Sequence, residues 1–404
     1  MRVLFLTKSH PVYGGVERWL ADLVDDLSSA GLDCRVGLAR GARFNRPERY
    51  ARAYPGLPWF PLDGTTGSPA GRRWAVERAI RRIRPHAVIP VMLSDALATA
   101  VSLKTGAGPR IVYPIHEVDP GVARDLERFG PALDCVVAVD ALTSTLVDEA
   151  PAVLCRAWIP QGVPAPPRLT PRPGTGGPLR LGFAGRLEVS MKRAQDLADL
   201  AKHLECRPFT WQLTVAGEGT LAASLAARLA PLVTSDRVRF MGGLAPVEME
   251  ERFYPNIDVL VITSERETGP LVAFEAMLHG CVVVTADFRG RRENGLLRHG
   301  ENCLVFPVGD MEAAADRLEA LASDAALRHR LADRGRRDAL REHSREVQGR
   351  RWRDLLIHVA EAPARTGAAG IPLRLSDKTR ELGRRLLRRR FPHQTGRGEW
   401  PHYS

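Results

Sequence analysis

The chain has 404 residues, which is long enough for two domains of ordinary size. Its hydrophobic fraction of 44% and charged fraction of 26% are typical of a globular protein, and no apolar run reaches the ~20 residues that a membrane-spanning helix needs. The net charge is +11, but nine lysines and arginines against three acids fall within 374–404, so the rest of the chain is only mildly basic. This distribution argues against a nucleic-acid-binding protein and for a basic appendage.

The first apolar run is expected to be a buried strand rather than a signal peptide. Residues 1–7 are too few for a signal-peptide core and lack a small-residue cleavage site. We therefore expect a cytoplasmic protein. The six cysteines are scattered without a Cys-x-x-Cys pair, which in a reducing compartment predicts buried thiols and neither a disulfide framework nor a metal site.

Short apolar runs alternate with helical periodicity, a pattern typical of a doubly wound α/β fold. After a strand at 3–6, a loop with Gly14 and Gly15 leads into a helix with apolar residues on one face. Further strands of the first half are expected at 87–91, 110–115 and 135–139. The sequence thus predicts a first domain over 1–163.

The segment 164–178 is rich in proline and glycine, which indicates an interdomain linker. The strand and helix pattern then restarts. Strands of the second half are expected at 179–184, 212–216, 238–241, 259–262 and 281–285. We expect a second domain over 179–343, a helix at 344–362 and a basic tail over 363–404.

The most informative motif lies between Glu267 and Glu275, directly after the buried run 257–263. Between these glutamates lies the turn Gly269-Pro270, where Pro270 suits the first position of a helix. A strand that ends in a tight turn and opens a helix presents unpaired amides to an anion. The two carboxylates can accept hydrogen bonds from sugar hydroxyls. A phosphate site between two carboxylates predicts a nucleotide-sugar ligand.

This segment resembles the Glu-x7-Glu motif of retaining glycosyltransferases of family four, which have the GT-B fold. The resemblance extends over roughly residues 1–360 and is strongest from 179 to 308. It implies an α/β protein with two Rossmann-like, doubly wound parallel-sheet domains facing a central cleft, and a last helix that crosses back to the first domain. It also implies transfer of a sugar from a UDP- or GDP-linked donor to an acceptor hydroxyl, with retention of configuration.

The resemblance assigns roles to the motif residues. Glu267 would contact the donor sugar, Glu275 would bind the nucleotide ribose, and the backbone of Gly269, Pro270, Leu271 and Val272 would hold the diphosphate. In the first domain, Gly14 and Gly15 match a glycine loop near the donor phosphates and the acceptor. His116 matches a histidine beside the donor sugar; the alternative is a histidine bonded to nearby backbone.

The turn after the strand at 179–184 also matches the family. Gly185 and Arg186, followed by Lys192, correspond to a segment whose arginine and lysine reach the diphosphate, and these cations would neutralise the leaving group. The spacing leaves open whether Lys192 or Arg193 faces the phosphate. Two further donor-side residues are Gly217, at the end of a strand, and Glu293, in the place of a family glutamate.

No Asp-x-Asp occurs in the sequence, so we expect no metal and no other cofactor. A GT-B epimerase acting on the sugar nucleotide and a non-catalytic GT-B partner subunit remain alternatives. The acceptor is expected to be a saccharide or a lipid-linked saccharide, in polysaccharide, glycolipid or other glycoconjugate biosynthesis. Residues 374–391 form a basic amphipathic segment that predicts peripheral contact with an anionic membrane; a basic tail without a membrane role is the alternative.

Overall fold

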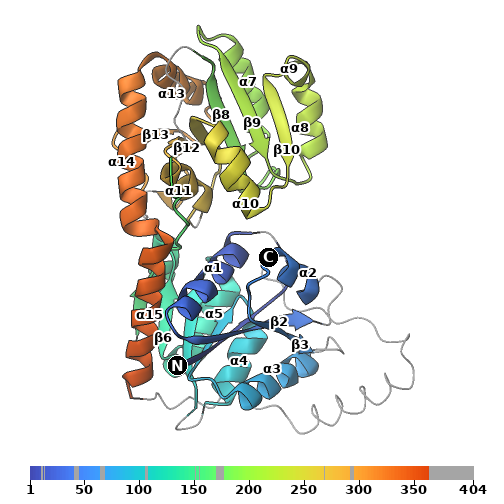
Figure 1. The fold of residues 1–404 in the computed structure, drawn as a ribbon, viewed down its shortest axis with the longest axis vertical. Coiled ribbons are helices and arrows are strands. Elements are labelled where there is room, and N and C mark those ends of the chain that lie inside the picture. Colours follow the sequence, from blue (N-terminus) through green and yellow to red (C-terminus); the bar gives the residue numbers. More distant parts are fainter. Residues whose placement is uncertain are drawn as a thin grey trace, which may run out of the picture. The chain divides into compact units, whose positions relative to one another are not determined.

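A computed structural model describes residues 1–10, 12, 14–40, 45–63, 69–104, 108–150, 152–153, 155–169, 177–267, 269–291 and 295–363. The chain divides into two compact units (Figure 1). The first comprises Met1–Pro160 with Gln348–Ser404, and the second is Gln161–Val347. Within the described residues, no helix is both long enough and apolar enough to cross a membrane.

The first unit contains a parallel sheet of seven strands in the order β3-β2-β1-β4-β5-β6-β7. Its strands are β1 (Arg2–Thr7), β2 (Asp33–Arg40), β3 (Trp59–Asp63), β4 (Ala87–Val91), β5 (Arg110–Ile115), β6 (Cys135–Ala138) and β7 (Arg156–Trp158). Its helices are α1 (Gly15–Ser29), α2 (Pro47–Ala53), α3 (Pro69–Ile83), α4 (Ser94–Ser102), α5 (Pro120–Phe129), α6 (Ala141–Asp148) and most of α15 (Arg345–Glu361), with a 3-10 turn η1 (Gly130–Ala132). The strand order reverses between β1 and β4.

Successive side chains of each strand point to opposite faces of this sheet, and helices cover both faces, so both faces are buried. Leu4 and Leu6 of β1 pack into a cluster with residues of α3, α4 and α5. Val3 and Phe5 pack into another cluster with α1 and α15, whose Trp352 is fully buried. The C-terminal helix is therefore part of the first unit's core, and helices lie on both faces of the sheet (Figure 1).

The second unit has a parallel sheet of six strands in the order β10-β9-β8-β11-β12-β13. Its strands are β8 (Leu179–Ala184), β9 (Trp211–Ala216), β10 (Val238–Gly242), β11 (Val259–Ile262), β12 (Val282–Ala286) and β13 (Cys303–Phe306). Its helices are α7 (Asp196–Glu205), α8 (Ala222–Arg228), α9 (Ala230–Thr234), α10 (Pro246–Glu248), α11 (Leu271–Leu278), α13 (Met311–Ser323) and α14 (Ala325–His343), with a π-helical turn η2 (Met249–Phe253) and a 3-10 turn η3 (Tyr254–Asn256). The order reverses between β8 and β11.

The expected fold class is confirmed: both sheets are parallel and doubly wound, and every strand named from the sequence exists within a residue or two of its expected bounds. Four strands were missed: β2, β3, β7 and β13. β2 was missed because Asp33 and Arg35 interrupt its apolar run on the exposed side. Of the expected linker 164–178, residues 170–176 lie outside the described part, and its other residues form no helix or strand.

Candidate functional site

In open α/β sheets, ligands bind beyond the carboxyl ends of the strands where the strand order reverses. In the second unit this point lies between β8 and β11. Lys192 lies in the segment that follows β8, and Glu267 in the segment that follows β11. The fold thus places two of the residues singled out in the sequence at the position where a ligand is expected.

Lys192 and Glu267 form an ion pair. The Nζ of Lys192 lies 2.6 Å from Oε1 of Glu267, and the side chains are 18% and 8% exposed. The hydroxyl of Ser264 donates to the same Oε1 atom, also at 2.6 Å. Because a buried carboxylate is costly unless it is paired and hydrogen-bonded, these two donors hold the Glu267 carboxylate in one orientation.

The segment carrying Lys192 is fixed to the β11 loop through its backbone. The hydroxyl of Thr263 donates to the carbonyl oxygen of Lys192 at 2.8 Å. The amide of Glu265 donates to the carbonyl oxygen of Met191, also at 2.8 Å. The ion pair is therefore held on ordered backbone at both ends, as a preorganised binding group requires.

Lys192 and Arg193, which the sequence could not separate, have different partners. Arg193 takes a left-handed backbone conformation, with φ of 49°, and its guanidinium forms two hydrogen bonds to Asp196, at 2.8 and 3.2 Å. This conformation also explains why α7 begins at Asp196 rather than near 193. Arg186 has a side chain that is 65% exposed and lies 3.3 Å from Glu188.

The turns after β8 and β9 pack backbone against backbone. Gly185 has φ of 156° and Gly217 has φ of 148°, and the Gly185 amide donates to the carbonyl oxygen of Ala216 at 3.0 Å. A Cβ atom on Gly217 would overlap the Gly185 carbonyl oxygen. Glycine is required at 217 for both reasons.

The turn that contains Gly269 and Pro270 leads into α11. Gly269 has φ of 116°, a conformation that favours glycine. Pro270 precedes the helix as its N-cap and Leu271 is the first helical residue, one position later than expected from the sequence. Among the described residues, no side chain caps this N-terminus. The first amides of α11, including those of Leu271 and Val272, can therefore bind an anion.

Glu275 lies in the second turn of α11 and is half-buried. Its Oε2 atom accepts a hydrogen bond from the hydroxyl of Tyr254. The Tyr254 ring is fully buried and stacks on His279, with ring centroids 4.9 Å apart and an interplanar angle of 28°. Tyr254 thus orients the Glu275 carboxylate from within the core.

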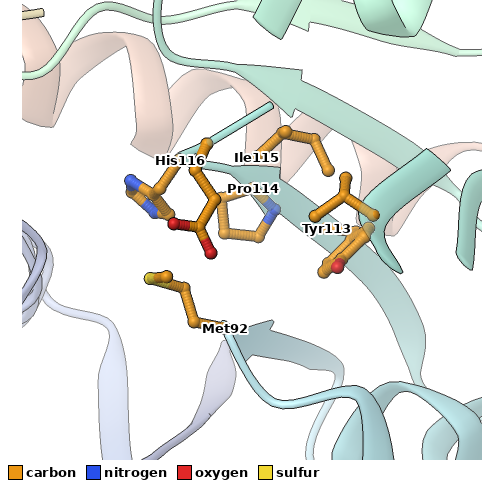
Figure 2. A pocket seen from close by; sticks show the side chains of 7 residues that line it. Met92, Tyr113, Pro114, Ile115 and His116 are labelled. Carbon is orange, nitrogen blue, oxygen red and sulfur yellow. The ribbon is translucent and has the colours of Figure 1, made fainter. Parts of the chain in front are cut away.

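The first unit has a small pocket at the carboxyl ends of β4 and β5. Figure 2 shows Met92 on one side of it and the segment from Tyr113 to His116 on the other. Glu117 and Val122 complete the lining. Met92 follows β4 in the left-handed region, with φ of 49°; strained non-glycine backbone of this kind gathers at functional sites.

His116 is 6% exposed, and its ring packs edge-on against Trp19 with centroids 4.3 Å apart. Burial lowers the pKa of His116 to about 3, so the imidazole is neutral at physiological pH. Glu17, in the first turn of α1, is also buried, and burial raises its pKa to about 7 although Lys8 opposes the shift. Near neutral pH, His116 is therefore neutral and Glu17 is about half protonated.

Gly14 and Gly15 stand at the start of α1. Gly14 precedes the helix with φ of −173°, an extended conformation open to any residue. What glycine supplies at this position is therefore the absence of a side chain rather than an unusual backbone angle. Glu293 and the segment 374–391 lie outside the described residues, and their roles stay predictions.

Two residues of the site were missed in the sequence, Ser264 and Tyr254. Ser264 precedes Glu267 by three residues in the same loop, so a local pattern could have pointed to it. Tyr254 meets Glu275 only through the fold. Among the described residues, no group of three or more His, Cys, Asp or Glu side chains could hold a metal ion; metal-independent action stays a prediction.

Comparison with known proteins finds similarity to glycosyltransferases. Residues 178–324 match the family model Glycosyl transferases group 1. The chain is 28% identical over 363 residues to the phosphatidyl-myo-inositol mannosyltransferase of Mycobacterium leprae. The aligned region covers 81% of this chain and 88% of that protein. It is 33% identical over 139 residues to the lipopolysaccharide core biosynthesis glycosyltransferase LpsE of Rhizobium meliloti, which covers 34% of this chain. The matches span only 38% of LpsE and 30% of an exopolysaccharide phosphotransferase of Streptomyces coelicolor.

The solved structures that resemble this chain share its two-unit architecture. HepE of Anabaena, in complex with UDP and glucose, aligns with a TM-score of 0.71 at 20% identity and covers 89% of this chain and 100% of HepE. The apo form of the lipopolysaccharide outer core galactosyltransferase WaaB aligns with a TM-score of 0.68 at 18% identity and covers 88% of this chain and 99% of WaaB. At these identities the likeness establishes the GT-B fold.

Proposed function

We propose that this chain, which has the GT-B fold, is a group 1 glycosyl transferase that transfers a sugar from a nucleoside-diphosphate sugar to an acceptor hydroxyl. The observation that carries this proposal is the arrangement at the strand-order reversal of the second unit. There the paired Lys192 and Glu267 lie in the segments that follow the two central strands. The N-terminus of α11, which no described side chain caps, comes next, with Glu275 in the second turn of that helix.

The donor contacts follow from the chemistry of these groups. The amides at the start of α11 and the Lys192 ammonium supply the positive groups that a diphosphate requires. The exposed Arg186 guanidinium can add a contact to the same phosphates. Glu275, held by Tyr254, accepts hydrogen bonds from ribose hydroxyls, and Glu267 accepts them from sugar hydroxyls. A UDP- or GDP-linked sugar fits this set, and the HepE complex with UDP makes UDP the first nucleotide to test.

The reaction we propose proceeds with retention and without metal. As the sugar leaves, charge grows on the diphosphate, and the α11 amides with Lys192 stabilise it. The acceptor hydroxyl attacks from the face on which the phosphate departs, and a phosphate oxygen takes its proton. His116 takes part as a neutral hydrogen-bonding ring beside the donor sugar, because its lowered pKa precludes a charged role near neutral pH. Gly14 and Gly15 leave room for the reacting groups.

The acceptor we propose is a saccharide or lipid-linked saccharide in polysaccharide or glycolipid biosynthesis. The similarity to a glycosyltransferase of lipopolysaccharide core biosynthesis supports this proposal. The enzyme would act in the cytoplasm, with residues 374–391 giving peripheral contact with an anionic membrane. Flotation with anionic liposomes of the full chain and of a chain ending at Gly370 tests this contact. Equal flotation of the two proteins would remove it.

The test of the activity is release of nucleotide from UDP-glucose, UDP-galactose and GDP-mannose, with and without a saccharide or lipid-extract acceptor. Glu267→Ala should lower turnover by about 100-fold or more, because it removes a contact that strengthens in the transition state. Glu265→Ala is the matched control, since its side chain lies in the same loop and is 66% exposed. An anomeric assignment of the product by NMR reports retention.

Equal loss of turnover in both variants, or none in Glu267→Ala, would remove the role proposed for Glu267. A product formed from the donor alone, with its sugar altered and no acceptor consumed, would replace the transferase by an epimerase.

A further inference from the structure

Two of the six cysteines, far apart in the sequence, meet in the first unit. The Sγ atoms of Cys135 and Cys155 lie 3.0 Å apart, with the Cys155 thiol donating to the Cys135 sulfur. Cys135 begins β6 and is fully buried, whereas Cys155 directly precedes β7 and is half-buried. The separation is ~1 Å more than the length of a disulfide bond.

The backbone register places the two residues opposite each other. Val136 pairs with Arg156 in the parallel register of β6 and β7, so the residues preceding each of these face one another. The amide of Val136 donates to the carbonyl oxygen of Cys155 at 3.0 Å. Neighbouring strands lie about 4.8 Å apart, which falls within the Cα separations of about 4.4–6.8 Å that a disulfide allows. Both side chains belong to the same apolar cluster, so they share one face of the sheet.

We propose that Cys135 and Cys155 form an oxidisable dithiol, at which hydrogen peroxide closes a disulfide across β6 and β7 of the first unit. Because β7 is at one edge of its sheet and Cys155 is half-buried, the Cys155 sulfur is the one that a small oxidant reaches first. Cys135, behind it in the core, is the resolving thiol.

The chemistry balances with one peroxide per disulfide. The Cys155 sulfur attacks the peroxide, the O–O bond breaks, and Cys155 becomes a sulfenic acid as water leaves with the thiol proton. The Cys135 sulfur then attacks the Cys155 sulfur, the S–O bond breaks, and a second water leaves with the Cys135 proton. Two thiols are oxidised and the peroxide is reduced to two waters. The product ties the strand that leads into the second unit to the core of the first.

The test uses the full-length reduced protein treated with hydrogen peroxide and then alkylated, with non-reducing peptide mapping by mass spectrometry. The expected result is one cross-linked peptide pair that contains Cys135 and Cys155, a mass loss of about 2 Da, and reversal by dithiothreitol. Cys135→Ala should prevent the cross-link and leave Cys155 as sulfenic acid or higher oxides. Cys206→Ser, at an exposed cysteine of the second unit, should leave the cross-link unchanged.

A second sample is treated with peroxide in denaturing urea. Comparing it with the folded protein tests whether the cross-link depends on the fold or only on the reactivity of the two cysteines. In urea we expect the cross-link between Cys135 and Cys155 to be lost or to occur together with cross-links between other cysteines. Oxidation of Cys155 to sulfinic acid in the folded wild type while Cys135 is still alkylated would overturn the proposal. So would disulfides formed only between molecules.

Discussion

From the burial of His116 we predict how the stability of the folded protein depends on pH. Its pKa is lowered from 6.5 to about 3 by burial, so between pH 8 and pH 5 it stays neutral in the folded protein and takes up a proton in the unfolded chain. Because the pKa of His116 is lower in the folded than in the unfolded state, this group stabilises the fold above pH 6.5. Its contribution to stability is lost as the pH falls below 6.5. At pH 5, which is ~1.5 units below the unfolded pKa, the loss is about 2 kcal/mol at 1.36 kcal/mol per unit.

Glu17 acts in the opposite direction over the same range. Its pKa is raised from 4.5 to about 7, so its contribution is full below pH 4.5 and is lost as pH rises through 7. Between pH 8 and pH 5 the contribution of Glu17 to stability rises by about 2.5 kcal/mol. The contributions of these two groups nearly compensate each other between pH 8 and pH 5.

The variants His116→Gln and Glu17→Gln separate the two contributions. We expect the free energy of unfolding of His116→Gln, measured relative to wild type by urea denaturation, to rise by about 2 kcal/mol from pH 8 to pH 5. Glu17→Gln should change by a similar amount with the opposite sign. If the profile of a variant stays parallel to that of the wild type across this range, the shifted pKa of the replaced group is refuted.

Further predictions concern the second unit. Gly217→Ala should destabilise the protein by about 3 kcal/mol or more, measured by thermal denaturation, whereas Gly56→Ala, in open space, should change stability little; equal effects would contradict the packing of the β8 and β9 turns. Lys192→Met should weaken nucleotide binding by calorimetry about 10- to 100-fold through loss of a charge-assisted contact, and Lys202→Met, on an exposed part of α7, should not. Tyr254→Phe keeps the buried ring and should weaken nucleotide binding about 5- to 30-fold; unchanged binding would remove its positioning role.

The fold was readable from the sequence because buried parallel strands are nearly continuous apolar runs. β4 and β11 are fully buried and were located by this signal. β2 was not, because Asp33 and Arg35 on its exposed side disguise the run. Helix boundaries could not be placed from the sequence where the local backbone conformation determines them. Arg193 is an example, because its left-handed conformation moves the start of α7 to Asp196.

Candidate site residues could be named from the sequence where a local pattern carries them, as with the spacing of Glu267 and Glu275. Contacts between distant segments were not found. The meeting of Tyr254 with Glu275 depends on how η3 packs against α11, and that of Cys135 with Cys155 depends on a strand that the sequence did not reveal. The different partners of Lys192 and Arg193 likewise required side-chain geometry.

The central claim, a nucleotide site on the second unit, is tested most directly by thermal shift of the full chain with UDP, GDP, ADP, CMP and dTDP in EDTA. A ligand at 100 times its Kd stabilises the folded state by ~2.7 kcal/mol, a shift of a few degrees. We expect one nucleotide to raise the melting temperature more than the others do, and Glu275→Gln to abolish most of that shift. No shift with any nucleotide, in EDTA or with added Mg²⁺, would contradict it.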